Sequence, residues 1–395
     1  MVLSQPIQEW TEVDLQRLVD GRAQENEVLE FKSSMWGKGD EEVREMLRDI
    51  SSMANQKGGR ILIGIEADAD GAAVAMTGVE SGNHVERITS SCLDNIDPRL
   101  IGLRVQDIPL ESGGVVVAIV VPPSLNSPHM VTFRGLNQFW IRHNRQKAPM
   151  NVDEIRGAVQ RTIDSVSVAE RYIQGCIERV LQVADDIRKP WLLLAATPVP
   201  LTYDLIDIQD LALRQVLTEM RQHPVCRSIL FTFRTGGCIP TLRGLRAAVG
   251  TRSGSTVDFL ELHRNGHLEV ATSFPWRESD AHSIPAKLIA CFIDDFVNLT
   301  GQVWRHIGIA RPLLLRVVFL NAYRMWLGLP SEVHPPSDMR DRLWEEQHLM
   351  IPEQYATDIT SAEERKRLVK TLNDLLWNAF GLEECSVISR EGGWI

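Results

Sequence analysis

Glu25, Glu30 and Lys32 stand close together in the segment ENEVLEFK, residues 25–32. Because successive side chains of a β-strand point to opposite faces, Glu30 and Lys32 are expected side by side on one face of a strand. Glu25 precedes this strand and can lean over its start. Carboxylates beside an ammonium group could hold a divalent ion such as Mg²⁺ or Mn²⁺ next to a phosphodiester. The other interpretation is a solvated strand with a surface ion pair, which stabilises a fold little.

Basic and aromatic side chains are interleaved in residues 129–147, which contain no aspartate or glutamate. A groove for single-stranded nucleic acid uses this combination, because basic groups contact phosphates and aromatic rings stack on bases. A solvated strand edge and hairpin would give the same pattern. The residues predicted to bind nucleic acid are Arg134, Phe139, Trp140, Arg142, Arg145 and Lys147.

Length and charge narrow the possible partners. The 395 residues are enough for two or three domains. The formal net charge is −10, so nucleic-acid binding, which rests on counterion release by Lys and Arg, has to come from a local patch.

No run is apolar enough to suggest a membrane span or a signal peptide, so we expect a cytoplasmic protein with no membrane partner. Six scattered cysteines lack metal-ligand spacing and are expected to be reduced thiols.

Hydrophobic periodicity predicts the elements that would position these residues. A short helix over residues 11–20, with Thr11 and Asp14 as a capping box, leads into the strand that carries the glutamates. A helix over residues 41–57 follows, with an apolar stripe and two glycines at its end. Residues 60–66 then form a buried strand. The pattern predicts a strand, a helix and a second strand for this region.

Beyond this region the sequence predicts a helical stretch, followed by a part that contains both strands and helices. Residues 151–188 have an intermittent apolar face, with a break between two helices near the middle. Beyond them the pattern predicts strands, including a hairpin that turns at Asn265 and Gly266. The last helix is expected to begin at Ser361, with Glu364 completing a capping box. We find no catalytic pattern in this second region.

Several segments, taken in their order, resemble the Schlafen AlbA_2 domain. They are Glu25 followed by LEFK, MANQKGG at 53–59, ILIGIE, NIDPRL at 95–100, VVVAIVVPPS and FWIRHN at 139–144. Together they cover about residues 15–155. Gln56 stands where the family usually has a threonine. The resemblance implies an α/β fold with a small mixed sheet and carries no implication for the remaining residues.

The resemblance also implies an activity. Nuclease members of the family cut structured RNA, notably tRNA, with a site of three carboxylates. By position, Glu25 and Glu30 match the first two acids, Glu66 or else Asp68 matches the third, and Lys32 matches the family's lysine. We therefore expect a metal-dependent endoribonuclease that holds Mg²⁺ or Mn²⁺ with Glu25, Glu30 and Glu66, while Lys32 stabilises charge on the phosphate. Phage defence or a stress response is the role that the resemblance implies.

The whole chain is expected to be an α/β (α+β) protein with three parts. These are an AlbA_2-like domain at residues 1–157, a helical linker at 158–190, and an α+β sensing or assembly domain at 191–395. A homo-oligomer is expected, because a single lobe offers half of the cleft that two-lobed relatives form.

Two other functions stay open. One is a non-catalytic DNA-, RNA- or ATP-binding regulator, although the chain has no G-x-x-x-x-G-K-[S/T] phosphate loop; the other is a scaffold subunit of a defence complex.

Overall fold

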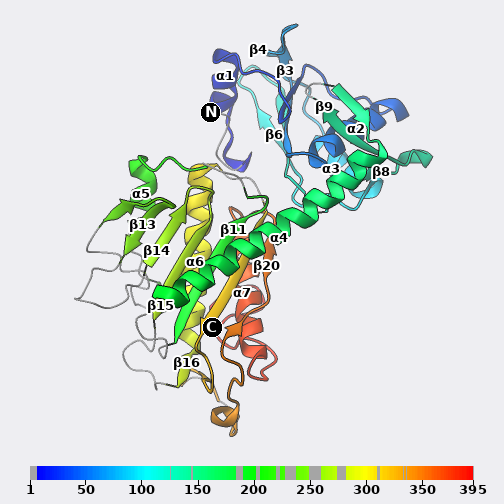
Figure 1. The fold of residues 1–395 in the computed structure, drawn as a ribbon. Coiled ribbons are helices and arrows are strands. Elements are labelled where there is room, and N and C mark those ends of the chain that lie inside the picture. The colour runs from blue at the N-terminus through cyan, green and yellow to red at the C-terminus, as the bar shows by residue number, and fades with distance from the viewer. Residues whose placement is uncertain are drawn as a thin grey trace. The chain divides into compact units, whose positions relative to one another are not determined.

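The computed structural model describes residues 7–124, 126–143, 146–183, 190–201, 205–218, 223–226, 237–248, 259–273, 282–308, 312–331, 333–334 and 336–394. The chain forms two compact units (Figure 1). Unit 1 comprises Met1–Val166 and Ala310–Pro312, and unit 2 comprises Ser167–Ile309 and Leu313–Ile395. Helices and sheets occur together in both units, which confirms the expected α/β class. The division into three parts stays a prediction.

The main sheet of unit 1 has four strands in the order β1-β2-β7-β6. Strand β1 is parallel to β2, whereas β7 is antiparallel to β2 and β6, so the sheet is mixed, as the resemblance implied. Parallel neighbours need a crossover, and the helix α2 (Asp40–Ala54) supplies it. The strands are β1 (Leu29–Lys32), β2 (Gly59–Ile63), β6 (Arg104–Pro109) and β7 (Val115–Val121).

Helices cover both faces of this sheet. On one face, α2 and α3 (His84–Asn95) share an apolar core with β2 and β7. On the other, α1 (Glu12–Asp20) contributes Leu15 to a core that includes Phe31 of β1. Because strand side chains alternate, Glu30 lies on the face toward α2. The alternation of apolar and charged residues in β1 therefore directs the charged ones toward that helix.

A second sheet of unit 1 is antiparallel and has the order β10-β9-β8-β5. The C-terminal end of α2 anchors it: the side-chain amide of Asn55 donates to the carbonyl oxygen of Trp140 in β9 at 2.9 Å. Figure 1 shows β9 beside α2. The remaining elements of unit 1 are η1 (Ile7–Glu9), β3 (Ile65–Ala67), β4 (Ala73–Met76), β5 (Ile96–Asp97), β8 (Met130–Val131), η2 (Phe133–Gly135), β9 (Gln138–His143) and β10 (Gln146–Pro149).

Unit 2 is built on an antiparallel sheet with the order β12-β13-β14-β15-β11-β17-β19, and β20 also pairs with β17. The hairpin between β14 and β15 turns at Asn265 and Gly266, as expected, and Gly266 has a positive φ of 83°. The strands are β11 (Trp191–Pro198), β12 (Cys238–Pro240), β13 (Gly244–Ala248), β14 (Phe259–His263), β15 (Leu268–Ser273), β17 (Leu313–Leu320), β19 (Leu349–Met350) and β20 (Gln354–Ala356).

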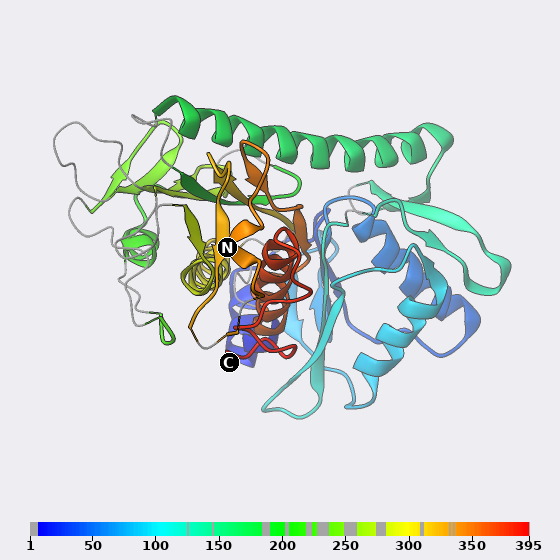
Figure 2. The same cartoon turned by 90° about the horizontal axis from the view of Figure 1, so that it is seen from below.

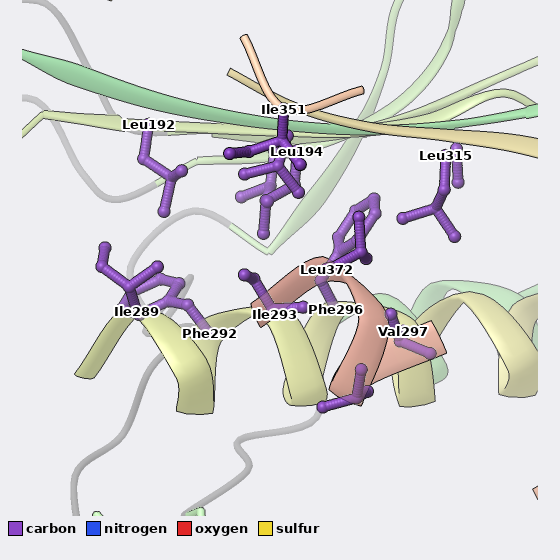
Figure 3. Close-up of a cluster of buried hydrophobic side chains, with 14 of the residues drawn as sticks. Leu192, Leu194, Ile289, Phe292, Ile293, Phe296, Val297, Leu315, Ile351 and Leu372 are labelled. Atoms are coloured by element: carbon purple, nitrogen blue, oxygen red, sulfur yellow. The ribbon is translucent and has the colours of Figure 1, made fainter. Parts of the chain in front are cut away.

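Two helices pack on one face of this sheet. Figure 3 shows Leu192 and Leu315 of the sheet facing Phe296 of α6 (Ala286–Ile307) and Leu372 of α7 (Ala362–Asn378), all fully buried. This apolar interior is the main core of unit 2. The other elements are α5 (Leu211–Thr218), η3 (Met339–Asp341), and the parallel pair β16 (Ser283–Pro285) and β18 (Trp326–Gly328).

The long helix α4 (Val152–Val183) is continuous through residues 166–168, where two helices had been expected. The β-branched residues of this stretch lower helix propensity only slightly, so they do not interrupt the helix. Its residues from Ser167 onward belong to unit 2 and lie on the face of the sheet opposite α6 (Figure 2).

Three local expectations can be compared with the structure. The capping box of Thr11 and Asp14 is present at α1. At α7 the predicted start was right, since Ser361 is the N-cap residue. The predicted capping box was wrong, because the Ser361 side chain makes no capping hydrogen bond and the Glu364 carboxylate instead accepts from the backbone of Thr357. No helix in the described parts of the chain is long and apolar enough to cross a bilayer.

The expectation of six free thiols was also wrong for one pair. Cys226 and Cys291 form a disulfide in unit 2, whereas the other four cysteines are free. The two partners are separated by 65 residues in sequence, so the spacing of cysteines along the chain gave no indication of their proximity.

Candidate functional site

Glu30 and Lys32 lie side by side on β1, as the strand alternation predicted, and they form the edge of a larger charged cluster. The Lys32 ammonium nitrogen lies 3.4 Å from Glu30 Oε1. Arg142 of β9 contacts the other oxygen, Glu30 Oε2, and Lys147 of β10 lies 3.9 Å from Oε1. Glu30 is only 8% exposed and Arg142 only 2% exposed, so this is an internal ion pair and not a solvated one.

Asp49 of α2 is the second acid of the cluster, and the sequence reasoning missed it. Its carboxylate is fully buried. Lys32 lies 3.0 Å from Oδ2, the Trp36 indole nitrogen donates to the same oxygen at 3.2 Å, and Lys147 contacts Oδ1. The sequence does contain a signal, because Asp49 lies between Leu47 and Ile50 within the apolar stripe of α2. An acid at such a position requires a buried partner.

We call Glu30, Lys32, Asp49, Arg142 and Lys147 the charged cluster of unit 1. All four carboxylate oxygens of its two acids contact a basic side chain within 4.0 Å. The ammonium groups form its more open side, with 16% of the Lys32 side chain and 23% of the Lys147 side chain exposed. Charge pairing offsets the cost of burying these groups.

The cluster shifts the protonation equilibria of its members. Burial alone would raise the pKa of Glu30, but the positive charges of Arg142, Lys147 and Lys32 together outweigh it and hold the pKa below its ordinary value. Burial lowers the pKa of Lys147, and the negative charge of Glu30 counteracts this only in part. Glu30 is therefore an ionised partner at neutral pH.

One further acid lies at the rim of the charged cluster. Glu45 of α2 contacts the Lys32 ammonium nitrogen at 3.2 Å, and half of its side chain is exposed. Unlike the two buried acids, Glu45 can turn toward solvent without leaving an unpaired charge inside the protein. Of the three acids that contact Lys32, Glu45 is therefore the one that an approaching anion can displace most easily.

The other acids of the predicted metal site are not members of the charged cluster. Glu25 Oε1 accepts a hydrogen bond from the Phe31 backbone at 3.1 Å. Glu66 of β3 is exposed. Asp68 caps its own turn by accepting from the backbone of Ala72 at 2.9 Å, and it also pairs with Arg22. Glu25 and Asp68 therefore accept hydrogen bonds from nearby backbone groups, and Glu66 is exposed to solvent.

The three-carboxylate arrangement does not form in this structure. In the described ranges, the sets of three His, Cys, Asp or Glu whose ligand atoms lie within 4.8 Å of one another are all in unit 2. Glu25, Glu30 and Glu66 are not such a set. Since the oxygens of Glu30 are also occupied by basic groups, this arrangement does not fit a Mg²⁺ or Mn²⁺ ion held by those three residues.

The aromatic residues of the predicted nucleic-acid surface are part of the interior. Trp140 belongs to the core under α2, where the Arg48 guanidinium lies 4.7 Å from its ring centroid. Phe139 is partly buried against Met150 and Ala158. Neither ring is a free stacking platform, because β9 is covered on both faces.

The basic residues of the same stretch separate into three groups. Arg142 and Lys147 belong to the charged cluster, whereas Arg134 is exposed and pairs with Asp40. His129 is fully buried, and burial lowers its pKa, so it adds no positive charge at neutral pH. The predicted contact residue Arg145 lies outside the described residues.

Comparisons with known proteins agree with the resemblance. Residues 25–151 match the family model described as Schlafen, AlbA_2. No curated protein matched the chain. One similar solved structure is the N-terminal domain of a Nitrosomonas europaea protein described as related to the ATP-dependent DNA helicase RecG, with 16% identity, a TM-score of 0.27, and coverage of 36% of this chain and 94% of that one. Another is a Corynebacterium diphtheriae protein, with 13% identity, a TM-score of 0.28, and coverage of 93% of this chain and 61% of that one.

Proposed function

We propose that the Schlafen AlbA_2 domain at residues 25–151 binds nucleic acid, with Lys32 and Lys147 contacting phosphate oxygens. One observation carries this proposal: both buried acids, Glu30 and Asp49, have every carboxylate oxygen paired with a basic group. A further cation would have to displace one of these basic groups. An anion would instead meet ammonium groups that are already fixed in place at the open side of the cluster.

The buried acids have a positioning role in this proposal. A lysine side chain loses considerable rotamer freedom when it is held in one conformation. Asp49 and Glu30 hold the two ammonium groups in the folded protein, so that binding a phosphate requires little further ordering. Each ammonium group has three N–H donors, and the contacts to Asp49 and Glu30 leave donors for phosphate oxygens.

Single-stranded or structured RNA is the partner that we propose, because the resemblance to RNA-cutting family members points in that direction. Metal-dependent cleavage of such RNA is the second candidate function. It is favoured by the pairing of Glu30 and Lys32 on one strand, which the family pattern requires. The nuclease activity, the Mg²⁺ or Mn²⁺ requirement, the defence role, ATP binding and a homo-oligomeric assembly stay predictions.

The test is a titration of labelled tRNA and of a single-stranded RNA with the full chain in EDTA, followed by fluorescence anisotropy. Lys32→Gln should weaken binding about tenfold, the loss expected for one charge-assisted hydrogen bond. Glu45→Gln should strengthen binding, because it removes the rim carboxylate that competes with phosphate for Lys32. Opposite effects from two neighbouring substitutions cannot result from a general loss of folding.

Lys57→Gln is the matched control, since Lys57 is an exposed lysine of unit 1 that pairs with Glu27. It should leave the affinity unchanged. A parallel reaction with Mn²⁺ and the variant Glu30→Ala examines cleavage. Cleavage that needs the metal, and that Glu30→Ala abolishes while RNA binding in EDTA is retained, would establish the endoribonuclease instead. Absence of binding to both RNAs would reject the nucleic-acid proposal.

A further inference from the structure

A buried polar cluster in unit 2 has no role in the function proposed above. It lies where α4 packs on strands β14 and β15, on the face of the sheet opposite the apolar core. Cys176 of α4, His267 in the hairpin and Glu269 of β15 form its centre, and all three are completely buried. Their ligand atoms lie within 4.8 Å of one another.

The distances between these atoms fit a tetrahedral metal ion. Cys176 Sγ lies 3.3 Å from His267 Nε2, and His267 Nε2 lies 3.6 Å from Glu269 Oε2. Bonds of about 2.3 Å from zinc to sulfur and about 2.0 Å to nitrogen or oxygen, at tetrahedral angles, place donor atoms roughly 3.3 to 3.6 Å apart. Sulfur, imidazole nitrogen and carboxylate oxygen are also the donor types that zinc accepts.

A buried oxygen without a partner points to the same position. Glu269 Oε2 accepts no hydrogen bond from any residue that the structure describes, although Glu269 is fully buried. An ionised carboxylate oxygen in such a setting is costly unless a cation or a donor satisfies it. His267 Nε2 lies 3.6 Å from this oxygen, which is beyond a normal hydrogen bond.

The surrounding contacts orient the three side chains. Thr197 Oγ1 lies 2.8 Å from His267 Nδ1, so a proton on Nδ1 leaves the lone pair of Nε2 directed at the centre of the group. The other carboxylate oxygen, Glu269 Oε1, accepts from Arg179 at 2.8 Å and lies 3.0 Å from His263 Nε2. Metal-binding histidines and carboxylates in proteins are held by outer contacts of this kind.

We propose that Cys176, His267 and Glu269 bind one zinc ion, which fixes α4 to the sheet of unit 2. The three protein donors leave one position of a tetrahedral ion for a water molecule. Binding exchanges the thiol proton of Cys176 for the metal: the S–H bond breaks, the Zn–S bond forms, and the proton leaves to solvent.

Two other groups in unit 2 are less suited to a metal. Glu261 is near His263 and Glu269, but its carboxylate oxygens already accept from Thr241 at 2.9 Å and Arg246 at 2.7 Å. The other group contains His223 with Cys226 and Cys291, whose sulfurs are bonded to each other in the disulfide. The group around Cys176 alone combines a free thiol with an unpaired carboxylate oxygen.

The experiment is a measurement of the metal content of the full chain after expression with zinc and purification without chelator. We expect about one zinc ion per chain. Cys176→Ser and Glu269→Gln should lose it. Cys385→Ser should keep it, because Cys385 is also a buried free thiol of unit 2 but belongs to none of these groups.

Cobalt substitution of the wild-type chain keeps the test decisive if the Cys176 or Glu269 variant does not fold. Co²⁺ at this site should show the visible bands of tetrahedral coordination together with a thiolate charge-transfer band. A chain without metal, or cobalt without the thiolate band, would overturn the proposal. Zinc that persists in Cys176→Ser and disappears in Cys226→Ser would overturn it too, by placing the metal at the other cysteine pair.

Discussion

At the scale of single residues, the main feature of unit 1 is the burial of charges whose positions in sequence suggest a surface. Glu30 and Asp49 are both enclosed, and Lys32, Lys147 or Arg142 lies against each carboxylate. Such groups contribute to stability only as complete pairs, because the loss of one member leaves a buried charge without a partner. The acids of this cluster therefore stabilise unit 1 only while their basic partners are in place.

The pH dependence of stability follows from the pKa of Glu30. Because this pKa is lowered in the folded state, the stabilisation by ionised Glu30 is present above the ordinary value of 4.5 and is lost as the pH falls through the folded value. Glu30→Gln should lower the free energy of unfolding by about 3 kcal/mol at neutral pH. The difference between wild type and variant should shrink below pH 4.5.

Urea denaturation of both proteins from neutral pH down to about pH 3 measures this difference. Glu27→Gln is a suitable control, since Glu27 pairs with the exposed Lys57 and its loss should cost less than about 1 kcal/mol. A gap between wild type and Glu30→Gln that stays constant across this range would show that Glu30 is not an ionised partner in the folded protein.

At the scale of elements, the turn from α2 to β2 places β2 beside β1 and thereby builds the sheet under the charged cluster. Gly58 makes this turn with a positive φ of 70°. A Cβ atom at Gly58 would collide with the carbonyl oxygen of Val121 in β7. Glycine is required here for its backbone conformation and also for its lack of a side chain.

Gly58→Ala should therefore destabilise unit 1 by about 3 kcal/mol, which combines backbone strain with a steric clash. Gly113→Ala is the matched control, because Gly113 also has a positive φ, of 94°, but a Cβ there would meet no atom within 4 Å. It should cost only about 1 kcal/mol. Thermal unfolding of both variants measures the two effects, and equal losses would show that the clash is relieved.

At the scale of the whole molecule, a net charge of −10 restricts how nucleic acid can bind. A generally acidic surface repels a polyanion, so binding has to depend on a few fixed cations. In the proposed mode these are Lys32 and Lys147. A small number of phosphate contacts releases few counterions and gives a weak dependence of affinity on salt.

The slope of log affinity against log salt for single-stranded RNA should be about −1.4, because each neutralised phosphate contributes about −0.7. Lys32→Gln should reduce its magnitude by about 0.7. Anisotropy titrations at several salt concentrations give both slopes. A much steeper slope that Lys32→Gln leaves unchanged would mean that the RNA binds on another surface, and Lys57→Gln should not alter the wild-type value.

The sequence by itself determined the local features of this protein. The alternation in β1 placed Glu30 and Lys32 on one face, the capping box marked the start of α1, and Asn265 with Gly266 marked a hairpin. The order of the segments also identified the Schlafen AlbA_2 match at residues 25–151. These features depend on sterics and hydrogen bonds between residues that are near in the chain, so a short window of sequence contains the information.

Only the tertiary structure decided which distant residues meet. Arg142 reaches Glu30 across 112 positions, and Lys147 reaches Asp49 across 98. Cys176 and His267 are separated by 91 positions. Such contacts depend on how β9, β10 and α4 pack against other elements, and packing is set by the whole core. For the same reason Glu25, Glu30 and Glu66 do not form a set of ligand atoms within 4.8 Å of one another, although the family resemblance had implied one site.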